Sequence, residues 1–498
     1  MVHFHSIVDE QPPFSSTHAE REVSYLRTAA QEQTWTAPNG RTFALRIPPT
    51  VYPPREDTDL MAKVLQSAGL MRGRTLMEIG CGSGALSLYA ASEGCEVVAC
   101  DVNPYAVSCT RAHFDAAGLQ ATVHEGGPGP AVDGGPDQWA GAQPYDVVVW
   151  NMPYLSSNTA SDGVLGPLEE ASLLDTDEVG LFPRTLDLIV QGHLLAEQGV
   201  GFFLISSKGP TDDALAQAWR VGLGATVAEQ LTFEDGEHLS VLAVWRPFEH
   251  APKRVLETVH STNTELMASA DGFGATLRAD MQTNGRGRRQ RRWLAFEGAL
   301  FASWVVGDGE SVVHQPLGQV VVGVGLVRLI RHFAPAYAEH ISLKWPNDVY
   351  LRTEASSPWK KVAGILFEAS TKGTMTRIVG GIGVNLSCSD TRYAGLDAIG
   401  WNGTAADLHR SIHAMVASHY EAPHLSVSLP SWYRSEAGVQ AVLEGVNSLG
   451  PIFYRNNAIA AYGLAPEGQI LLGEGDVVVD DPDELMWSNI QFGVEDLS

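Results

Sequence analysis

The feature that most constrains the fold is a run of alternating glycines, Gly80, Gly82 and Gly84, between an apolar segment and a helix-forming one. Residues 75–79 are typical of a buried strand, and residues 85–93 have helix-forming character. Glycine lets the backbone turn sharply and approach a ligand without a side chain in the way. The sequence therefore predicts a strand, a glycine turn and a helix, the repeating unit of a parallel α/β sheet.

A second predicted strand, residues 96–100, ends at Asp101. An acid at the tip of the neighbouring strand is placed to accept hydrogen bonds from ribose hydroxyls. Glycine turns between a strand and a helix are common without any binding function. The acid at the next strand end therefore favours a binding site over a purely structural turn. Together they predict a nucleoside-binding site at the carboxyl edge of the sheet.

A third predicted strand, residues 145–150, runs directly into Asn151-Met152-Pro153-Tyr154. Outside this setting the tetrapeptide would be an ordinary loop. With the two preceding motifs, it resembles the class I S-adenosylmethionine-dependent methyltransferases, and specifically the HemK-type amino-methyltransferases, which carry Asn-Pro-Pro-Tyr here. The resemblance implies a Rossmann-like domain in which Asn151 accepts hydrogen bonds from an NH2 group and Tyr154 packs against the target. Met152 replaces the first proline and removes its rigidity.

Residues 51–58, Val-Tyr-Pro-Pro-Arg-Glu-Asp-Thr, resemble a segment that covers the cofactor in the release-factor glutamine methyltransferases of archaea and eukaryotes. The alternative is a proline-rich turn followed by a helix over residues 60–68, capped by Asp57 or Thr58. The resemblance implies S-adenosylmethionine as cofactor. It assigns cofactor binding to Thr58, Glu78, Gly80, Gly82, Gly84, Asp101 and Asn151, and catalysis to Asn151, Pro153 and Tyr154.

The methyl acceptor stays open at this point. A glutamine of a translation release factor leads, and the alternatives are a protein lysine, a small molecule, an adenine of nucleic acid, a carboxyl group in biotin synthesis, or a regulatory domain without catalysis. The formal charge is -25, and residues 1–250 hold 13 Lys+Arg against 32 Asp+Glu. Such an acidic field repels phosphate backbones, so we expect no DNA partner. An amide oxygen also suits an NH2 better than a carboxylate.

The second half of the chain contains five ordered motifs, and the most basic of them is an arginine loop within residues 282–293. A charge run usually means a solvated face or a nucleic-acid patch. Interspersed glycines instead favour a loop whose arginines close around a phosphate. The five motifs are Ser-Thr-Asn at 261–263, Gln-Thr-Asn-Gly-Arg-Gly-Arg-Arg-Gln-Arg-Arg-Trp at 282–293, Lys-Trp-Pro-Asn-Asp at 344–348, Lys-Val-Ala-Gly-Ile-Leu at 361–366 and Gly-Ile-Gly-Val-Asn at 381–385.

In their order and residue types these motifs resemble those of the biotin protein ligases, and the resemblance extends over nearly all of residues 255–498. The resemblance implies that biotin and ATP, with Mg2+, form biotinyl-AMP, which a lysine of a biotin carboxyl carrier domain then attacks. It assigns catalysis to Lys361, Arg286 and Arg288, with Gln282 touching the ureido ring. The implied biotin- and ATP-binding residues are Ser261, Thr262, Asn263, Gln282, Gly285, Arg286, Gly287, Arg288, Trp293, Lys344, Asn347, Asp348, Lys361, Gly364, Gly383 and Asn385.

Two rival interpretations apply to this half: a binding module without catalysis, and a lipoate ligase of similar fold but different signature. The chain departs from the family in two places. Residues 352–360 form an insertion that should lengthen a surface loop, and Gln290 replaces a glycine of the arginine loop.

The predicted architecture is α/β in the first half and α+β in the second. It consists of an extension at 1–45, a methyltransferase domain at 46–247, a linker at 248–255, a ligase catalytic domain at 256–440 and an SH3-like β-barrel at 441–498. The barrel rests on short predicted strands separated by Gly, Pro and Asn turns. We see no helix-turn-helix module before Leu256, which disfavours a repressor function.

The five cysteines are widely spaced and form neither a zinc motif nor a disulfide framework. This pattern predicts a reducing, cytoplasmic protein with no resident metal site. The first residues are polar and lack the charged start and apolar core of a signal peptide. Every apolar run, including 320–326, is too short to cross a bilayer, so we expect no membrane partner.

Overall fold

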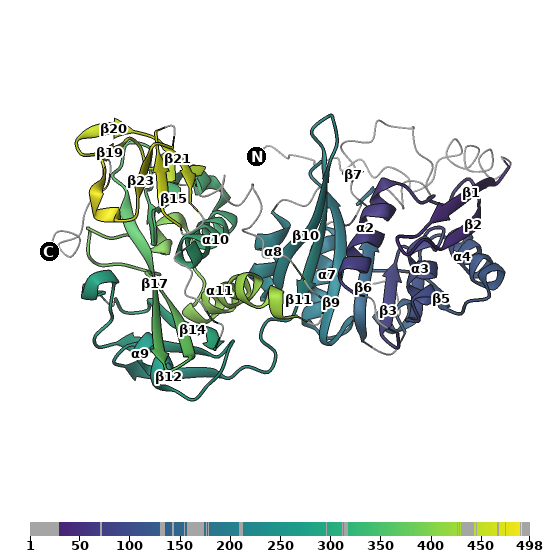
Figure 1. Ribbon diagram of the computed structural model, residues 1–498, viewed down its shortest axis with the longest axis horizontal. Coiled ribbons are helices and arrows are strands. Elements are labelled where there is room, and N and C mark those ends of the chain that lie inside the picture. The colour runs from purple at the N-terminus through teal and green to yellow at the C-terminus, as the bar shows by residue number, and fades with distance from the viewer. Residues whose placement is uncertain are drawn as a thin grey trace, which may run out of the picture. The chain divides into compact units, whose positions relative to one another are not determined.

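The computed structural model describes residues 29–490 apart from 70–71, 130–134, 142–143, 154, 157–173, 176, 178, 209–212, 295, 311, 313–316, 426, 428, 430–442, 445, 466–467, 474 and 489. The chain divides into two compact units, which Figure 1 shows coloured along the sequence. The first unit comprises Met1–Asp212 and Glu229–Leu242, and the second comprises Asp213–Ala228 and Ala243–Ser498. One seven-stranded sheet is built mainly from the first unit, although parts of β10 and β11 are assigned to the second, and another seven-stranded sheet lies in the second unit.

The sheet of the first unit has the strand order β10-β11-β9-β6-β3-β4-β5 (Figure 1). Strands β9, β6, β3, β4 and β5 pair in parallel along it. Their apolar residues are buried on both faces, as expected where helices cover a parallel sheet. The strands are β3 (Thr75–Ile79), β4 (Glu96–Asp101), β5 (Thr122–Glu125), β6 (Tyr145–Asn151), β9 (Leu195–Ser206), β10 (Gly224–Thr232) and β11 (His238–Trp245).

The strands predicted around the glycine turn are confirmed, and helix α3 (Ala85–Ser92) follows the turn as expected. An antiparallel hairpin of β1 (Gln31–Thr36) and β2 (Thr42–Ile47) precedes them and buries alternate residues. The remaining elements are α2 (Glu56–Ser67), α4 (Pro104–Ala117), α5 (Gly135–Trp139), α7 (Leu181–Val190), β7 (Leu155–Ser156) and β8 (Leu174–Asp175).

Helix α2 begins earlier than the sequence predicted. Its N-cap is Arg55, and the Thr58 hydroxyl accepts a hydrogen bond from the Arg55 backbone amide at 3.3 Å. Asp57 and Thr58 therefore lie inside the first turn, so the alternative interpretation, in which one of them caps a helix over residues 60–68, is wrong in detail. The physical reason is that three acids lie in that turn, where the positive end of the helix dipole stabilises negative charge.

The sheet of the second unit has the order β12-β13-β14-β18-β17-β16-β15. β12 pairs with β13 in parallel, and the other described pairings are antiparallel. The strands are β12 (Lys253–Val259), β13 (Thr276–Gln282), β14 (Leu300–Gly309), β15 (Ile341–Lys344), β16 (Asp348–Leu351), β17 (Lys360–Lys372) and β18 (Met375–Val384). Its α-helices are α8 (Ala214–Val221), α9 (Thr262–Ala268), α10 (Leu317–Phe333) and α11 (Ala405–Tyr420), and its short 3-10 helices are η1 (Arg288–Gln290), η2 (Pro335–His340), η3 (Leu396–Ile399), η4 (Ala422–His424) and η6 (Pro482–Glu484).

The segment before β12 is ordered within the second unit. Helix α8 packs against α11, and the buried Trp219 indole donates to the Ser418 hydroxyl at 2.8 Å. Phe248 is also buried, and its backbone amide donates to Glu421. The division into compact units therefore places residues 213–228, and the predicted linker 248–255, in the second unit.

The short C-terminal strands are present, as two three-stranded sheets with the orders β20-β19-β24 and β21-β22-β23. They are β19 (Ile452–Tyr454), β20 (Asn457–Ile459), β21 (Ala461–Leu464), β22 (Ile470–Leu472), β23 (Val477–Val479) and β24 (Leu485–Trp487). The closed SH3-like barrel stays a prediction. Among the residues that the structure describes, no helix is both long and apolar enough to span a bilayer.

Candidate active sites

The first unit has a pocket at the carboxyl ends of β3, β4 and β6, around the glycine turn. The predicted cofactor residues Thr58, Glu78, Gly80, Gly82, Asp101 and Asn151 line it, together with Tyr52, Met152, Pro153 and Leu181. Gly84 does not line the pocket and caps α3 from a left-handed conformation with φ +77°. Tyr154 lies outside the described residues.

The glycine turn is fixed from behind by helix α4. The Thr110 hydroxyl donates to the Gly82 carbonyl at 3.0 Å, and His113 Nδ1 lies 2.9 Å from the Ser83 carbonyl. A Cβ atom on Gly84 would come within 2.7 Å of the Thr110 side chain. The turn is thus held in one conformation before any ligand arrives, which lowers the ordering cost of binding.

The two acids of this pocket are buried and already hydrogen-bonded. Asp101 accepts from the Gly82 amide at 2.8 Å and from the Asn103 amide at 2.8 Å. Glu78 accepts from the Ser87 amide at 2.9 Å and from its hydroxyl. Burial raises the pKa of Glu78 to about 8 and raises the pKa of Asp101 above its usual value, against the opposing hydrogen bonds. Each carboxyl oxygen has two lone pairs and can accept more than one donor, so both acids can also hydrogen-bond to a ligand.

Asn151 is the last residue of β6, and within the described residues only the NH2 end of its side-chain amide is hydrogen-bonded. Its Nδ2 donates to Asp57 Oδ2 at 2.9 Å, whereas no hydrogen bond reaches its buried Oδ1 among the described residues. Met152 is also buried, and its backbone amide lies 3.3 Å from the Leu204 carbonyl. An unpartnered buried carbonyl oxygen beside a cofactor-sized pocket is a ready acceptor for an N–H group.

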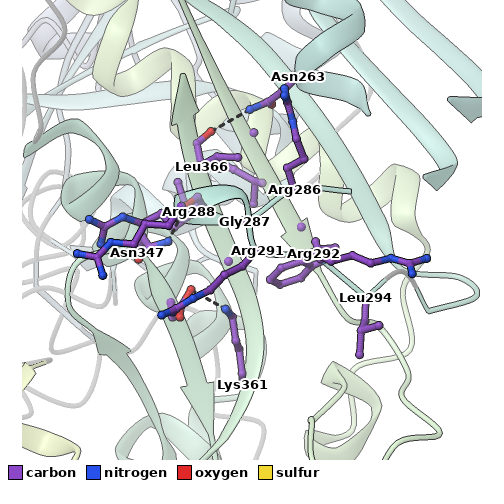
Figure 2. A pocket seen from close by; sticks show the side chains of 18 of the residues that line it. Asn263, Arg286, Gly287, Arg288, Arg291, Arg292, Leu294, Asn347, Lys361 and Leu366 are labelled. Carbon is purple, nitrogen blue, oxygen red and sulfur yellow. Dashed lines mark hydrogen bonds and ion pairs between the residues drawn. The ribbon is translucent and has the colours of Figure 1, made fainter. Parts of the chain in front are cut away.

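The second unit has a pocket lined by residues of all five motifs, and Figure 2 labels residues from four of them. Every predicted biotin- and ATP-binding residue lines it except Gly285, whose carbonyl accepts from the Trp293 amide at 2.9 Å. The motifs come from the start of α9, the end of β13, the arginine loop, the turn between β15 and β16, and strands β17 and β18. The sheet therefore brings together residues more than a hundred positions apart.

One end of this pocket is lined by neutral polar groups. Gln282 Oε1 accepts from the Thr262 amide at 2.8 Å and from its hydroxyl at 3.1 Å. This leaves the Gln282 NH2 as the donor end. Asn263 is held on both sides, because its Nδ2 donates to Glu368 at 2.8 Å and its Oδ1 lies 2.6 Å from the Ser303 hydroxyl. Such an arrangement suits a small uncharged ligand with both donors and acceptors.

Most cations of the arginine loop are engaged by carboxylates. Arg286 pairs with Glu368 at 3.1 Å, Arg289 pairs with Asp481 at 2.6 Å and with Asp483, and Arg291 pairs with Asp483 at 3.3 Å. Arg288 makes no ion pair within the described residues, and burial lowers its pKa despite the nearby Asp348 carboxylate. In Figure 2 Arg288 and Arg292 extend in opposite directions from the loop.

Lys361 lines the same pocket and pairs with Asp348 at 2.8 Å. Its ammonium also sits 5.0 Å from the centre of the Trp293 ring. Asn347 Nδ2 donates to the Ile365 carbonyl at 2.8 Å, which leaves its oxygen free to accept. Lys344 lies near the rings of Tyr350 and Trp487.

Trp293 fits against two glycines of the sheet. A Cβ on Gly364 would come within 2.5 Å of its ring, and one on Gly383 within 3.0 Å. In the described part of the chain, Trp293 Nε1 and Asn385 Oδ1 are buried without a hydrogen-bond partner. Both residues line the pocket, so they offer one unused donor and one unused acceptor to a ligand.

Sequence reasoning missed the carboxylates that hold these groups, namely Asp57 as a partner of Asn151, Glu368 on β17, and Asp481 and Asp483 near the C-terminus. It also missed Gly381, where a Cβ would meet Asn263 Oδ1 at 2.2 Å. Gly381 was visible as the first glycine of its motif. The acids carried no signal, because a single acid on a strand or turn resembles a solvated surface residue.

Comparison with known proteins gives two matches. Residues 258–385 match the model of the biotin/lipoate A/B protein ligase family, and residues 76–157 match the model of a methyltransferase domain. No curated protein matches the chain.

Solved structures with similar folds include biotin protein ligases and an RNA methyltransferase. The biotin protein ligase from Aquifex aeolicus in complex with biotin and ATP is 23% identical over 47% of this chain and 97% of its own, with a TM-score of 0.37. The enzyme from Leishmania major in complex with biotinyl-5-AMP is 20% identical over 46% and 98%, with a TM-score of 0.32. The T. thermophilus 16S rRNA N2 G1207 methyltransferase in complex with AdoMet and guanosine is 18% identical over 44% and 52%, with a TM-score of 0.30. The chain thus carries a methyltransferase domain match in its first unit and a biotin/lipoate ligase match in its second.

Proposed function

We propose that the second half of the chain is a biotin protein ligase, with a catalytic domain at 256–440 and an SH3-like barrel at 441–498. A biotin carboxylate oxygen attacks the α-phosphorus of ATP, and pyrophosphate leaves. The amine of a lysine on a biotin carboxyl carrier domain then attacks the carbonyl carbon, AMP leaves, and the amine proton passes to solvent. The observation that supports this most is the convergence of all five motifs on one pocket.

The pocket offers chemically suitable groups at each position of such a ligand. Gln282 and Asn263 suit the ureido ring, because the Gln282 NH2 is an oriented donor and the Asn263 oxygen has a second lone pair that can accept. Arg286, Arg288 and Lys361 would stabilise negative charge on the α-phosphate. Asn385 Oδ1 and Asn347 Oδ1 can accept from the adenine amino group, and Mg2+ would enter with ATP on its phosphate oxygens.

The test is adenylate formation by the purified chain with ATP and either biotin or lipoate. We expect pyrophosphate release with biotin only, followed by transfer of biotin to a carboxyl carrier domain. Preference for lipoate would replace the assignment by a lipoate ligase. Binding of biotin without pyrophosphate release would replace it by a non-catalytic module.

We further propose that residues 46–247 methylate a nitrogen, with a glutamine of a translation release factor as the leading acceptor. S-adenosylmethionine would supply the sulfonium methyl when bound. Asp101 would accept from its ribose, the glycine turn would face its amino-acid end, and Thr58 and Glu78 complete the pocket. Asn151 Oδ1 would accept an N–H of the acceptor and hold the nitrogen in line with the methyl group.

This proposal is supported by the unpartnered Oδ1 and tested through Asn151→Ala. We expect the variant to bind S-adenosylhomocysteine normally and to lose methylation of the release factor, followed by mass spectrometry. Full methylation by the variant would refute the role of Asn151. An acceptor identified as a lysine or a small molecule, from proteins and metabolites of cells lacking the gene, would replace the glutamine.

A further inference from the structure

Asp57 is a buried carboxylate in the first turn of α2, with 3% of its surface exposed. Four donors surround it. Its Oδ1 accepts from the Thr58 backbone amide at 2.6 Å and lies 3.2 Å from the Thr58 hydroxyl. Its Oδ2 accepts from the Tyr52 hydroxyl at 2.7 Å and from Asn151 Nδ2 at 2.9 Å. The carboxylate therefore connects the residue 51–58 segment directly to the end of β6.

These contacts determine which way the Asn151 amide faces. A carboxylate only accepts hydrogen bonds, so Asn151 must turn its NH2 toward Asp57. Its carbonyl oxygen is then left at the opposite end, where it is buried and unpartnered within the described residues. Reversing the amide would place two oxygens against each other and leave a buried donor unsatisfied.

We propose that Asp57 is a positioning residue that fixes Asn151 with its oxygen toward the methyl acceptor, so that the site selects groups that donate an N–H. This inference rests on the proposed methyl transfer and names the cause of its preference for nitrogen. Tyr52 shares the same oxygen of Asp57 and completes the arrangement.

The substitution Asp57→Asn should reverse the Asn151 amide rather than merely loosen it. The Thr58 backbone amide is a fixed donor at 2.6 Å, so the new side chain must keep its oxygen there. Its NH2 then faces Asn151, which must turn its own oxygen inward and its NH2 toward the acceptor. Asp57→Ala removes the same charge without imposing an orientation. Loss of charge alone predicts equal effects of the two variants, whereas an orienting role predicts that Asp57→Asn is worse.

The experiment compares the binding of sinefungin and S-adenosylhomocysteine to the full chain by calorimetry. Sinefungin carries an amino group where S-adenosylmethionine carries its methyl group, so its N–H groups report on the polarity of Asn151 without any methyl acceptor. We expect the wild type to prefer sinefungin by about tenfold, the size of one hydrogen bond to a charged group. Asp57→Asn should abolish this preference, Asp57→Ala should reduce it, and both should bind S-adenosylhomocysteine within about threefold of the wild type.

Asp59→Asn is the matched control, since Asp59 lies two residues further along the same turn and accepts from the Trp35 indole at 2.8 Å rather than from Asn151. It should keep the sinefungin preference. An Asp57→Asn variant that retains the wild-type preference, or one that only equals Asp57→Ala, would overturn the inference while leaving methyl transfer intact. A wild type that binds neither compound would overturn methyl transfer itself and this inference with it.

Discussion

The polar groups of the two pockets have different kinds of partners before a ligand binds. In the first unit the polar groups are bound by backbone amides and neighbouring side chains that can stay in place, as for Asp101 with Gly82 and Asn103. In the second unit, Lys361 and Arg286 are paired with Asp348 and Glu368. A phosphate there must take cations that already have carboxylate partners.

The difference follows from the charges of the proposed ligands. A sulfonium nucleoside can be recognised by fixed dipoles and a few acceptors, and a rigid turn gives precision at low ordering cost. A triphosphate needs several cations close together, which would repel one another in the absence of ligand. Pairing Arg286, Arg289, Arg291 and Lys361 with carboxylates reduces that repulsion, and the carboxylates then compete with the phosphate. The first pocket therefore depends on backbone geometry and the second on exchange of ion pairs.

The largest expected effect comes from breaking the central ion pair of the second pocket. Lys361→Ala leaves Asp348 as an unpaired carboxylate beside the phosphate position. Removing one group that stabilises charge in the transition state typically lowers the catalytic rate about 10²- to 10³-fold. The unpaired Asp348 carboxylate, which repels the phosphate, should lower the rate further. We expect pyrophosphate release with biotin and ATP to fall by about a thousandfold or more.

Lys360→Ala is the control for this variant, because Lys360 is the preceding residue of β17 and successive strand residues face opposite sides of the sheet. It should release pyrophosphate at the wild-type rate. Equal activity of wild type and Lys361→Ala would mean that Lys361 is a structural partner of Asp348 only.

A second expected effect is that acid shifts the stability of the two units in opposite directions. In the second unit, burial and then the charges of Arg278 and Lys253 lower the pKa of His409 to about 4, and burial lowers the pKa of His413 to about 3. Their contribution to folding is present above pH 6.5 and is lost as the pH falls toward 4, by about 3 kcal/mol for His409. In the first unit, the raised pKa of Glu78 gives a contribution that is present at low pH and lost as the pH rises through 8.

Differential scanning calorimetry between pH 8 and pH 5 checks this, with ligands that assign each transition. We expect the transition stabilised by biotin to move down with falling pH and the one stabilised by S-adenosylhomocysteine to move up or hold. His409→Gln cannot take up a proton and should flatten the decline of the second unit. Parallel movement of both transitions would contradict the opposite signs.

The sequence predicted the parts of both sites that are built from neighbouring residues. The glycine turn, the strands on either side of it and the acid at Asp101 form one local pattern, and the structure has each of them. The ligase motifs also converge as expected, because each is short and local and the sheet aligns their ends. What is encoded within about ten residues can be recognised from order and spacing alone.

Contacts between distant residues could not be predicted in this way. Glu368 accepts a hydrogen bond from Asn263 and forms an ion pair with Arg286. From the sequence alone it resembles a single acid in the exposed half of a long strand. Helix α8 reads as part of the methyltransferase domain, yet Trp219 packs on α11 of the second unit. Such pairings depend on how the sheets and helices assemble, which no local pattern specifies.

The third prediction tests whether the first pocket depends on the backbone conformation of its glycine turn. Gly84→Ala forces a side chain into a conformation with φ +77° and places its Cβ within 2.7 Å of Thr110. Strain and overlap together should cost about 1–3 kcal/mol in unfolding free energy and weaken S-adenosylhomocysteine binding. Gly118→Ala isolates the strain, since its φ is +64° and a Cβ there meets nothing within 4 Å. If both variants lose the same stability, the contact with Thr110 is not part of the constraint.

The smallest expected effect concerns the ion pairs between the arginine loop and residues 481–483. Arg289 is half exposed and its partner Asp481 is one-third exposed, so solvent screening leaves each pair only a small contribution to stability. Replacing Asp481 and Asp483 together by Asn should loosen the loop and speed the release of biotinyl-adenylate by about two- to fivefold, measured by trapping the released adenylate. Arg289→Ala should have a smaller effect, because it leaves the Arg291–Asp483 pair intact. Adding it to the double Asn variant should change little, because that variant has already lost both Arg289 pairs. In about 1 M salt the difference from wild type should disappear, since screening then acts over about 3 Å. An effect that persists in high salt would mean that these residues hold the loop by shape rather than by charge, and the second pocket would then resemble the first more than its ion pairs indicate.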